Sequence, residues 1–312
     1  MQQRYIGASG LQVSELGLGT MSWGQETDEE AAAESLKTFV DAGGTLIDTA
    51  ASYADGSSEA ILGSMLGDLV ARPDVVIVSK AGVSRRNGVR KVDTSRRSML
   101  DALDATLARL GTDHLDLWLA HAWDPCVPLE ETLSALELAV TTGRTRYAGV
   151  SNYSGWQLAR AVSLSNVPLI ANQTEYSLVH RSAEREVVPA AGALGVGIMA
   201  WAPLGRGVLT GKYRGSVPAE SRAASERSAG YVAPYLTGRP ERITEALLTA
   251  ARGLDRQPME VALGWLLQQK ALSAAIVGAR TPAQLKEAVS ADTSAVPDQI
   301  AEVLDEVSAL DD

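Results

Sequence analysis

The sequence predicts a (β/α)8 barrel, a closed ring of parallel strands surrounded by helices. Short apolar runs alternate with amphipathic stretches along most of the 312 residues, as strand–helix repeats do. Several of the runs are continuously apolar, which is typical of strands covered on both faces. The competing open, doubly wound sheet usually carries GxGxxG after its first strand, and GLGTMSWG at 17–24 lacks that motif. We therefore expect one barrel domain over residues 1–312.

The predicted elements alternate in chain order. The strands are the short apolar runs at 16–19, 45–48, 75–79, 115–120, 145–150, 168–173, 195–200 and 274–277. The helices have apolar residues at three- and four-residue spacing and lie at 28–42, 94–110, 129–141, 154–165, 182–193, 258–269 and 281–290.

Further segments add to the predicted barrel. Residues 4–14 predict a hairpin that turns at 8–10 and caps the bottom of the barrel. Helices at 241–253 and 297–309 fall outside the eightfold repeat. The stretch 213–240, between strands 7 and 8, is long and polar. A connection of this length is more often functional or disordered than a plain loop.

The composition is that of an ordinary globular protein, with 46% hydrophobic and 21% charged residues. A net charge of −10 argues against a nucleic-acid partner. No run approaches the roughly 20 apolar residues that a membrane span needs, and MQQRYIGASG at the start lacks a signal-peptide core. The single cysteine, Cys126, excludes an intramolecular disulfide framework. We expect a cytoplasmic protein without a membrane partner, and its oligomeric state is left open.

A local basic stretch stands out from the acidic composition. It comprises Arg85, Arg86, Arg90, Lys91, Arg96 and Arg97. These cations could contact a phosphate or an acidic substrate. We favour the simpler interpretation, a solvated loop followed by the start of a helix.

Polar side chains stand at the carboxyl ends of the predicted strands, where barrel enzymes have their active sites. Four of them follow strands 2, 3 and 4: Asp48, Tyr53, Lys80 and His121. Burying unpaired charges costs several kcal/mol each (order of magnitude), so folding alone does not explain this ring. The histidines show no metal-ligand spacing, and Ser151 lacks the Gly-x-Ser-x-Gly elbow of a hydrolase.

These four residue types suit the delivery of a proton to a carbonyl oxygen. Tyr53 is the candidate proton donor, because a nearby cation favours the phenolate and eases release of the proton. Lys80 supplies that cation, and Asp48 would pair with Lys80 and fix its position. His121 would hydrogen-bond the same carbonyl oxygen and orient the substrate.

The chain resembles the aldo-keto reductase superfamily in a series of motifs that occur in order. They are LIDTAASY at 46–53, VSK at 78–80, LAH at 119–121, GVSNY at 149–153, NQTEYS at 172–177, WAPLGRGVLTGK at 201–212 and VGARTPAQL at 277–285. The resemblance implies a (β/α)8 barrel that binds NADPH across its top and reduces small aldehydes or ketones. Tyr53 would then be the general acid, supported by Asp48, Lys80 and His121.

The same resemblance implies a cofactor-binding set. Its members are Gly19, Thr20, Met21, Asp48, Ser151, Asn152, Gln173, Trp201, Ala202, Pro203, Leu204, Gly205, Gly207, Lys212, Gly278, Arg280, Gln284 and Glu287. Ser151, Asn152 and Gln173 would hold the nicotinamide carboxamide, and Trp201 would stack on its ring. Arg280 would bind the 2′-phosphate, which makes NADH the less expected cofactor.

Some expectations about specificity and role stay open. The family often has Asn after the position of Glu287, and this chain has Ala288, so a contact to the adenine is expected to be missing. Trp23, Trp123 and Tyr231 are candidates for the wall of the substrate pocket. An alternative function is a cofactor-bound regulatory or sensor subunit, similar to the channel β-subunits of the same superfamily.

Overall fold

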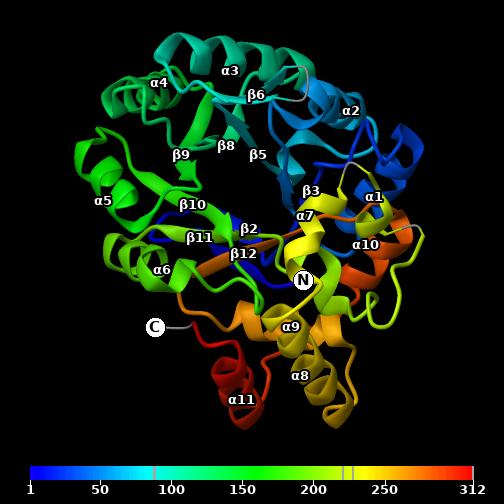
Figure 1. Cartoon of the computed structure of the whole chain (residues 1–312). Helices are drawn as coiled ribbons and strands as arrows, with labels where there is room; N and C mark the ends of the chain where they lie inside the picture. Colours follow the sequence, from blue (N-terminus) through cyan, green and yellow to red (C-terminus); the bar gives the residue numbers. More distant parts are fainter. Residues whose placement is uncertain (87–88, 220, 227, 311–312) are drawn as a thin grey trace.

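Eight parallel strands form a closed barrel in the computed structural model, and helices surround it (Figure 1). The structure describes residues 1–86, 89–219, 221–226 and 228–310. The barrel strands are β3 (Leu16–Gly19), β4 (Leu46–Asp48), β5 (Val76–Ala81), β8 (Leu115–Ala120), β9 (Thr145–Ser151), β10 (Leu169–Glu175), β11 (Gly197–Trp201) and β12 (Leu272–Val277). The pairing of β12 with β3 closes the ring, which confirms the predicted fold class.

The helices of eight or more residues lie where the amphipathic pattern predicts, with α2 as an addition. They are α1 (Glu29–Asp41), α2 (Ser57–Met65), α3 (Arg96–Leu110), α4 (Leu129–Thr141), α5 (Gly155–Leu164), α6 (Ala183–Leu194), α8 (Arg239–Gly253), α9 (Pro258–Leu267), α10 (Pro282–Val289) and α11 (Asp298–Ser308). Asp28 caps α1 by accepting from the Ala31 amide.

Helix α2 has no counterpart among the predicted helices, because glycine and serine weaken its pattern. A Cβ at Gly63 would lie 2.2 Å from the Arg109 carbonyl oxygen. The helix therefore needs glycine at this position to pack against α3, although glycine is a poor helix former.

The barrel interior is filled by side chains and plugged at its lower end by a hairpin. This hairpin pairs β1 (Gln3–Tyr5) with β2 (Gln12–Ser14), as predicted. Ile6 and Val13, both 0% exposed, join the cluster of strand side chains inside the barrel. Gly7 has φ +53°, and a Cβ there would lie 2.4 Å from the Gly195 carbonyl oxygen. Only glycine lets the turn approach the barrel this closely.

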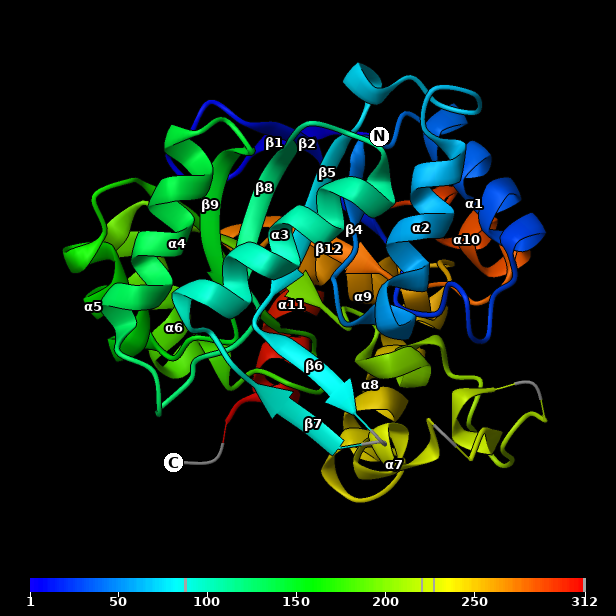
Figure 2. The same ribbon diagram turned by 90° about the horizontal axis from the view of Figure 1, so that it is seen from above.

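A second hairpin lies at the opposite end, where the strands finish (Figure 2). It pairs β6 (Val83–Arg86) with β7 (Val89–Val92). The predicted loop over the basic stretch is therefore wrong, since these residues form an antiparallel pair. The predicted solvent exposure of Arg85, Arg90 and Lys91 is confirmed, and so is the start of a helix at Arg96. Asn87 and Gly88, which separate the two strands, lie outside the described residues. The short helix α7 (Ala229–Val232), from the long segment between β11 and α8, lies next to this hairpin in Figure 2.

Strand register brings the predicted polar residues to the same end. Asp48 pairs with Gly19 on one side, and Gln173 pairs with Ser151 on the other side of the barrel. None of the helices in the described part of the chain combines the length and the apolar character needed to cross a membrane.

Candidate active site

A buried ammonium group lies at the centre of the candidate site. Lys80, near the end of β5, has a side chain that is 0% exposed. Its Nζ donates to Asp48 Oδ2 at 2.7 Å, to the Thr49 carbonyl oxygen at 2.8 Å and to Tyr53 Oη at 3.2 Å. An ammonium has three donors, so all of them are satisfied and the buried charge is paired.

Tyr53 reaches Lys80 from a tight turn that follows β4. The next two residues, Ala54 and Asp55, have φ of 48° and 52°. Left-handed backbone at two successive non-glycine residues is strained, and such strain concentrates at functional sites. The Tyr53 ring centroid lies 6.0 Å from that of His121, with the rings at 79° to each other. The structure thus brings all four predicted catalytic residues together.

The electrostatics differ from the sequence-based expectation at Tyr53. Burial raises the pKa of its phenol, and the opposing effect of Lys80 offsets this only in part. The effect of Lys80 has the predicted direction, but the net pKa is raised because desolvation of a phenolate outweighs one neighbouring charge. Tyr53 keeps its proton at neutral pH, as a proton donor must.

At neutral pH Lys80 is charged, whereas His121 is neutral. Burial tends to lower the pKa of Lys80, but Asp48 and Tyr53 overcome it, so the net pKa is raised and the ammonium stays charged. Burial, helped by the fields of Lys80 and Arg90, holds the pKa of His121 well below its usual value. The imidazole is neutral at pH 7, and its buried Nδ1 has no hydrogen-bond partner among the described residues.

Asp48 links this cluster to the residues predicted to hold a carboxamide. Its second oxygen, Oδ1, accepts a hydrogen bond of 2.6 Å from Gln173 Nε2. The Gln173 carbonyl oxygen accepts from Ser151 Oγ at 3.0 Å. Asn152 has φ +59° and accepts from Trp201 Nε1 at 3.0 Å. Asn152 Nδ2 also donates to Ser151 Oγ at 2.9 Å. One continuous hydrogen-bonded group therefore crosses the barrel mouth, and it comprises Asp48, Gln173, Ser151, Asn152 and Trp201.

The segment after β11 turns sharply beside Trp201. Ala202, Gly205, Arg206 and Gly207 all have positive φ. A Cβ at Gly205 would lie 2.5 Å from Val179 Cγ2, so close packing also requires glycine there. Pro203 is buried and Leu204 packs against the core, which holds this turn in place.

On the β3 side, the predicted cofactor residues differ in exposure. Gly19 and Thr20 are buried, and Thr20 Oγ1 donates to the Asp48 carbonyl oxygen at 3.1 Å. Met21 is 57% exposed at the rim. Thr20 thus supports Asp48, while Met21 is open to a ligand.

Three cations lie near one another beyond this turn and suit an anionic ligand: Lys212, Arg222 and Arg280. Burial lowers the pKa of Lys212, with the charges of Arg222 and Arg280 adding to the effect. The pKa of Arg222 is lowered mainly by burial, and Arg280 again contributes. None of the three forms an ion pair within the described residues. Mutual repulsion of this kind is unfavourable, and phosphate groups would relieve it.

The residues of α10 border this cation cluster. Gln284 Oε1 accepts from the Arg280 amide at 3.1 Å, which orders the loop at the start of the helix. Glu287 is exposed and lies close enough to Lys212 to affect its titration. Ala288 is only 2% exposed and packs in the core. Gly278 is exposed, and its carbonyl oxygen accepts from Arg222 Nη2 at 3.2 Å.

Two charged residues of this region, Arg206 and Arg222, are not among those predicted from the sequence. Arg206 makes two hydrogen bonds with the Glu175 carboxylate, and its guanidinium carbon lies 5.7 Å from the Trp201 ring centroid. A charged residue between two glycines in LGRG was the available signal for it. Arg222 lies in a polar stretch that offers no comparable signal.

The predicted pocket wall is only partly supported. Trp23 is 1% exposed and packs in the core, so the structure does not place it on an open wall. Trp123 lies two residues beyond His121 and packs edge-on against Tyr153 and Trp156. Tyr231 is 50% exposed in α7, and its hydroxyl accepts from Arg85 Nη2.

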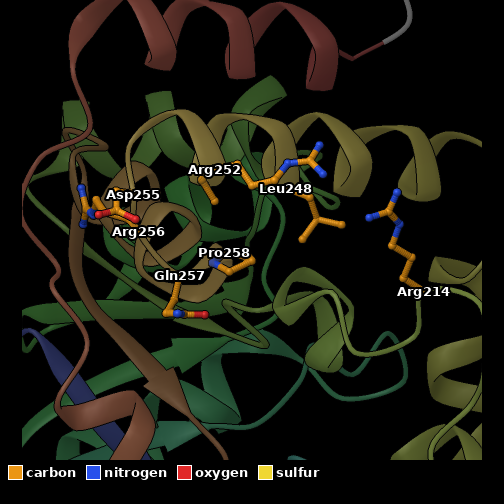
Figure 3. Close-up of a pocket in the computed structure, with 8 residues that line it drawn as sticks. Arg214, Leu248, Arg252, Asp255, Arg256, Gln257 and Pro258 are labelled. Carbon is orange, nitrogen blue, oxygen red and sulfur yellow. The ribbon is translucent and has the colours of Figure 1, made fainter.

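Two surface cavities lie apart from the four catalytic candidates. One of about 360 Å³ is bordered by α8, the start of α9 and Arg214 (Figure 3). The other, of about 380 Å³, is lined by Trp123, Cys126 and Arg160 among others. Neither cavity is lined by a member of the tetrad, as we call Asp48, Tyr53, Lys80 and His121, or by a member of the predicted cofactor set. Neither therefore changes the location of the candidate site.

Comparison with known proteins agrees with this geometry. The model of the Aldo/keto reductase family matches residues 15–309. L-glyceraldehyde 3-phosphate reductase of Escherichia coli K12 is 34% identical, over 93% of this chain and 87% of its own. A probable voltage-gated potassium channel subunit beta of Oryza sativa is 33% identical, over 99% and 96%. The thermostable aldo-keto reductase Tm1743, solved with the inhibitor epalrestat, has a TM-score of 0.78 at 30% identity, covering 98% of this chain and 100% of that one.

The chain therefore belongs to the aldo/keto reductase family. Membership makes it an oxidoreductase of a family that generally uses a nicotinamide cofactor and acts on small-molecule carbonyl compounds.

Proposed function

We propose that this protein reduces aldehydes or ketones to alcohols with NADPH, and that Tyr53 gives the proton. The observation that carries the proposal is the shared carboxylate of Asp48. One of its oxygens holds Lys80 beside Tyr53, and the other holds Gln173 in the group predicted to bind a carboxamide. Proton donor and cofactor site are thereby fixed relative to each other, which is the positioning that such a reaction requires.

Tyr53, Lys80 and Asp48 act as one unit in this proposal. The carbonyl oxygen of the substrate would lie against the Tyr53 hydroxyl. As the proton leaves, the 3.2 Å hydrogen bond from Lys80 Nζ stabilises the phenolate. Asp48 keeps Lys80 charged and in place throughout. Burial makes each of these contacts stronger than it would be in water.

His121 would orient the same oxygen. Its lowered pKa keeps the imidazole neutral, so that it donates a hydrogen bond without transferring its own proton. A protonated imidazole here would place a second cation near Lys80, which the site disfavours.

The cofactor would be held by residues already connected in the structure. Ser151, Asn152 and Gln173 offer polar groups to its carboxamide, and Trp201 offers a ring face for stacking. Lys212, Arg222 and Arg280 would hold its phosphates, with Arg280 on the 2′-phosphate, which is the basis for preferring NADPH. When bound, the reduced nicotinamide supplies the hydride.

The direct test is Tyr53→Phe, which removes one hydroxyl. Turnover of 4-nitrobenzaldehyde should fall about 10²–10⁴-fold, the usual contribution of general acid catalysis. NADPH binding, followed by its fluorescence, should stay within about twofold of wild type, because no predicted cofactor contact is lost. Tyr5→Phe is the matched control, since Tyr5 is 56% exposed on β1 at the other end of the barrel. Wild-type turnover by Tyr53→Phe would remove Tyr53 from the role of proton donor.

Arg280→Ala tests the preference for NADPH. It should weaken NADPH about 10–100-fold, since hydrogen bonds to charged groups are worth about 1.5–3 kcal/mol, and should affect NADH far less. Lys286→Ala is the control, because Lys286 is an exposed cation on α10, the helix that follows Arg280. Equal weakening of both cofactors by Arg280→Ala would show that Arg280 does not bind the 2′-phosphate.

A second candidate function is a cofactor-bound regulatory subunit, and similarity to a channel subunit beta favours it. The two candidates differ in turnover. If the protein binds NADPH but does not oxidise it with any reactive aldehyde, the second candidate is supported and the first is contradicted.

A further inference from the structure

The β6–β7 hairpin begins next to the catalytic tetrad. The His121 amide donates to the carbonyl oxygen of Ala81, the last residue of β5, at 2.8 Å. Only Gly82 separates Ala81 from the start of β6. The hairpin therefore stands beside His121, at the end of the barrel where a substrate would enter.

A chain of contacts also ties the hairpin to the opposite rim. Arg85 Nη2 donates to the Tyr231 hydroxyl, and Arg206 Nη1 donates to the Tyr231 carbonyl oxygen. Arg206 in turn pairs with Glu175, the last residue of β10, which lies beside Trp201 in the strand register. These contacts link the His121 side of the barrel mouth to the Trp201 side through the hairpin and α7, which are adjacent in Figure 2.

The strand register places two arginines on one face of this hairpin. Arg85 lies directly opposite Arg90, and side chains of directly paired residues share one face. Arg85 on this face reaches Tyr231 of α7, which Arg206 ties to the rim, and we therefore assign this face to the barrel mouth. The charge of Arg90 is also felt by the His121 imidazole.

Like charges directly opposite each other weaken a strand pair, so this arrangement needs another reason. Ser84 and Lys91 form the neighbouring pair, whose side chains point to the other face, and Lys91 has a carboxylate partner in Asp93. Arg85 and Arg90 have no ion-pair partner among the described residues. In a protein of net charge −10, two mouth-facing cations left without carboxylates suggest that an anion from outside completes the pair. Places where local rules are broken without compensation are often functional.

We propose that the carbonyl substrate carries an anionic group, a carboxylate or a phosphate, and that Arg85 and Arg90 bind it. This inference rests on the proposed reductase function and specifies its substrate class. The reacting carbonyl would lie at Tyr53 and His121, and the anionic group would lie under the hairpin. Arginine suits both anions, because its planar fork matches their oxygens.

The test compares aldehydes of one scaffold that differ in charge. The carboxylate arm pairs 4-carboxybenzaldehyde with 4-nitrobenzaldehyde, which has nearly the same shape without the charge. The phosphate arm pairs 4-formylphenyl phosphate with 4-methoxybenzaldehyde. For wild type, kcat/KM should be at least about tenfold higher for the charged member of one arm, and the better arm identifies the anion. The advantage should shrink as salt is raised.

The variants are Arg85→Gln, Arg90→Gln and the double substitution. The ratio of kcat/KM for the charged substrate to that for its neutral partner should fall about tenfold for each arginine, through KM. Lys91→Gln is the matched control, since it removes a cation from the other face of the same hairpin, and the ratio should keep its wild-type value.

The outcomes separate this inference from the proposed function. Absence of turnover with all four aldehydes contradicts the reductase function itself. Turnover with equal kcat/KM for charged and neutral partners supports the reductase function and overturns the anionic substrate. An unchanged ratio in the double variant, with a charge preference in wild type, overturns the assignment to Arg85 and Arg90.

Discussion

The two hairpins of this protein lie at opposite ends of one barrel and have opposite chemistry. The β1–β2 hairpin inserts Ile6 and Val13, both fully buried, into the barrel interior. None of the described side chains of the β6–β7 hairpin joins a buried cluster, Val89 is 69% exposed, and two arginines are presented toward the mouth. One hairpin completes the core, whereas the other extends the site.

Their polar groups differ in the same way. At the lower end Arg4 pairs with Glu15 and also donates to the Leu267 carbonyl oxygen, so the charge is satisfied within the protein. At the upper end His121 Nδ1 has no hydrogen-bond partner, and Arg85 and Arg90 have no carboxylate partner, among the described residues. In other barrels of this type the lower end serves stability and the upper end serves ligands, and we propose the same division here.

The largest effect is expected from Lys80→Met at the upper end. It leaves the buried Asp48 carboxylate without its cation, which should lower the free energy of unfolding by about 3–5 kcal/mol. Turnover should fall at least about 100-fold, because the phenolate of Tyr53 loses its stabilising charge. Urea denaturation and steady-state kinetics measure the two effects, with exposed Lys37→Met as control. Retention of wild-type turnover would break the assignment of the upper end to catalysis.

Ile6→Ala sharpens the comparison from the lower end. The lost methylene groups and the resulting cavity should cost about 2–5 kcal/mol of unfolding free energy. The value of kcat at a temperature where the variant is folded should stay within about twofold of wild type. A large loss of kcat in a folded variant would show that the two ends are not independent.

The smallest expected effect concerns pH and His121. Its pKa is lower in the folded protein than in the unfolded chain, so the unfolded chain binds more protons as the pH falls below about 6.5. Wild type should therefore lose up to about 1.4 kcal/mol of stability per pH unit in that range relative to His121→Asn. Denaturation of both proteins between about pH 5 and pH 8 measures the difference. Parallel stability curves would contradict the lowered pKa.

The periodic parts of the fold could be predicted from the sequence, and the exceptions have local causes. Buried strands and amphipathic helices have strong patterns, so β3, β8 and α4 begin and end where expected. Helix α2 is hidden because Gly63 meets a need of tertiary packing. The β6–β7 hairpin is hidden by its charges, although Asn-Gly between two alternating segments is a recognised hairpin signal.

The candidate site likewise has parts that could be predicted from the sequence and parts that could not. The tetrad could be predicted because each member follows a predicted strand, and parallel strands of a barrel end together. The raised pKa of Tyr53 could not, since it depends on how deeply the phenol is buried. The places of Arg206 and Arg222 depend on how an irregular segment folds back over the mouth, and no periodicity encodes this.

The central claim is that Tyr53 delivers the proton while other residues hold the cofactor. Its most direct test is a single-turnover experiment, in which protein loaded with NADPH is mixed with 4-nitrobenzaldehyde and the nicotinamide absorbance is followed. Tyr53→Phe should bind NADPH with the wild-type Kd and show a chemical step slower by about 10²–10⁴-fold. A chemical step at the wild-type rate in this variant would contradict the claim.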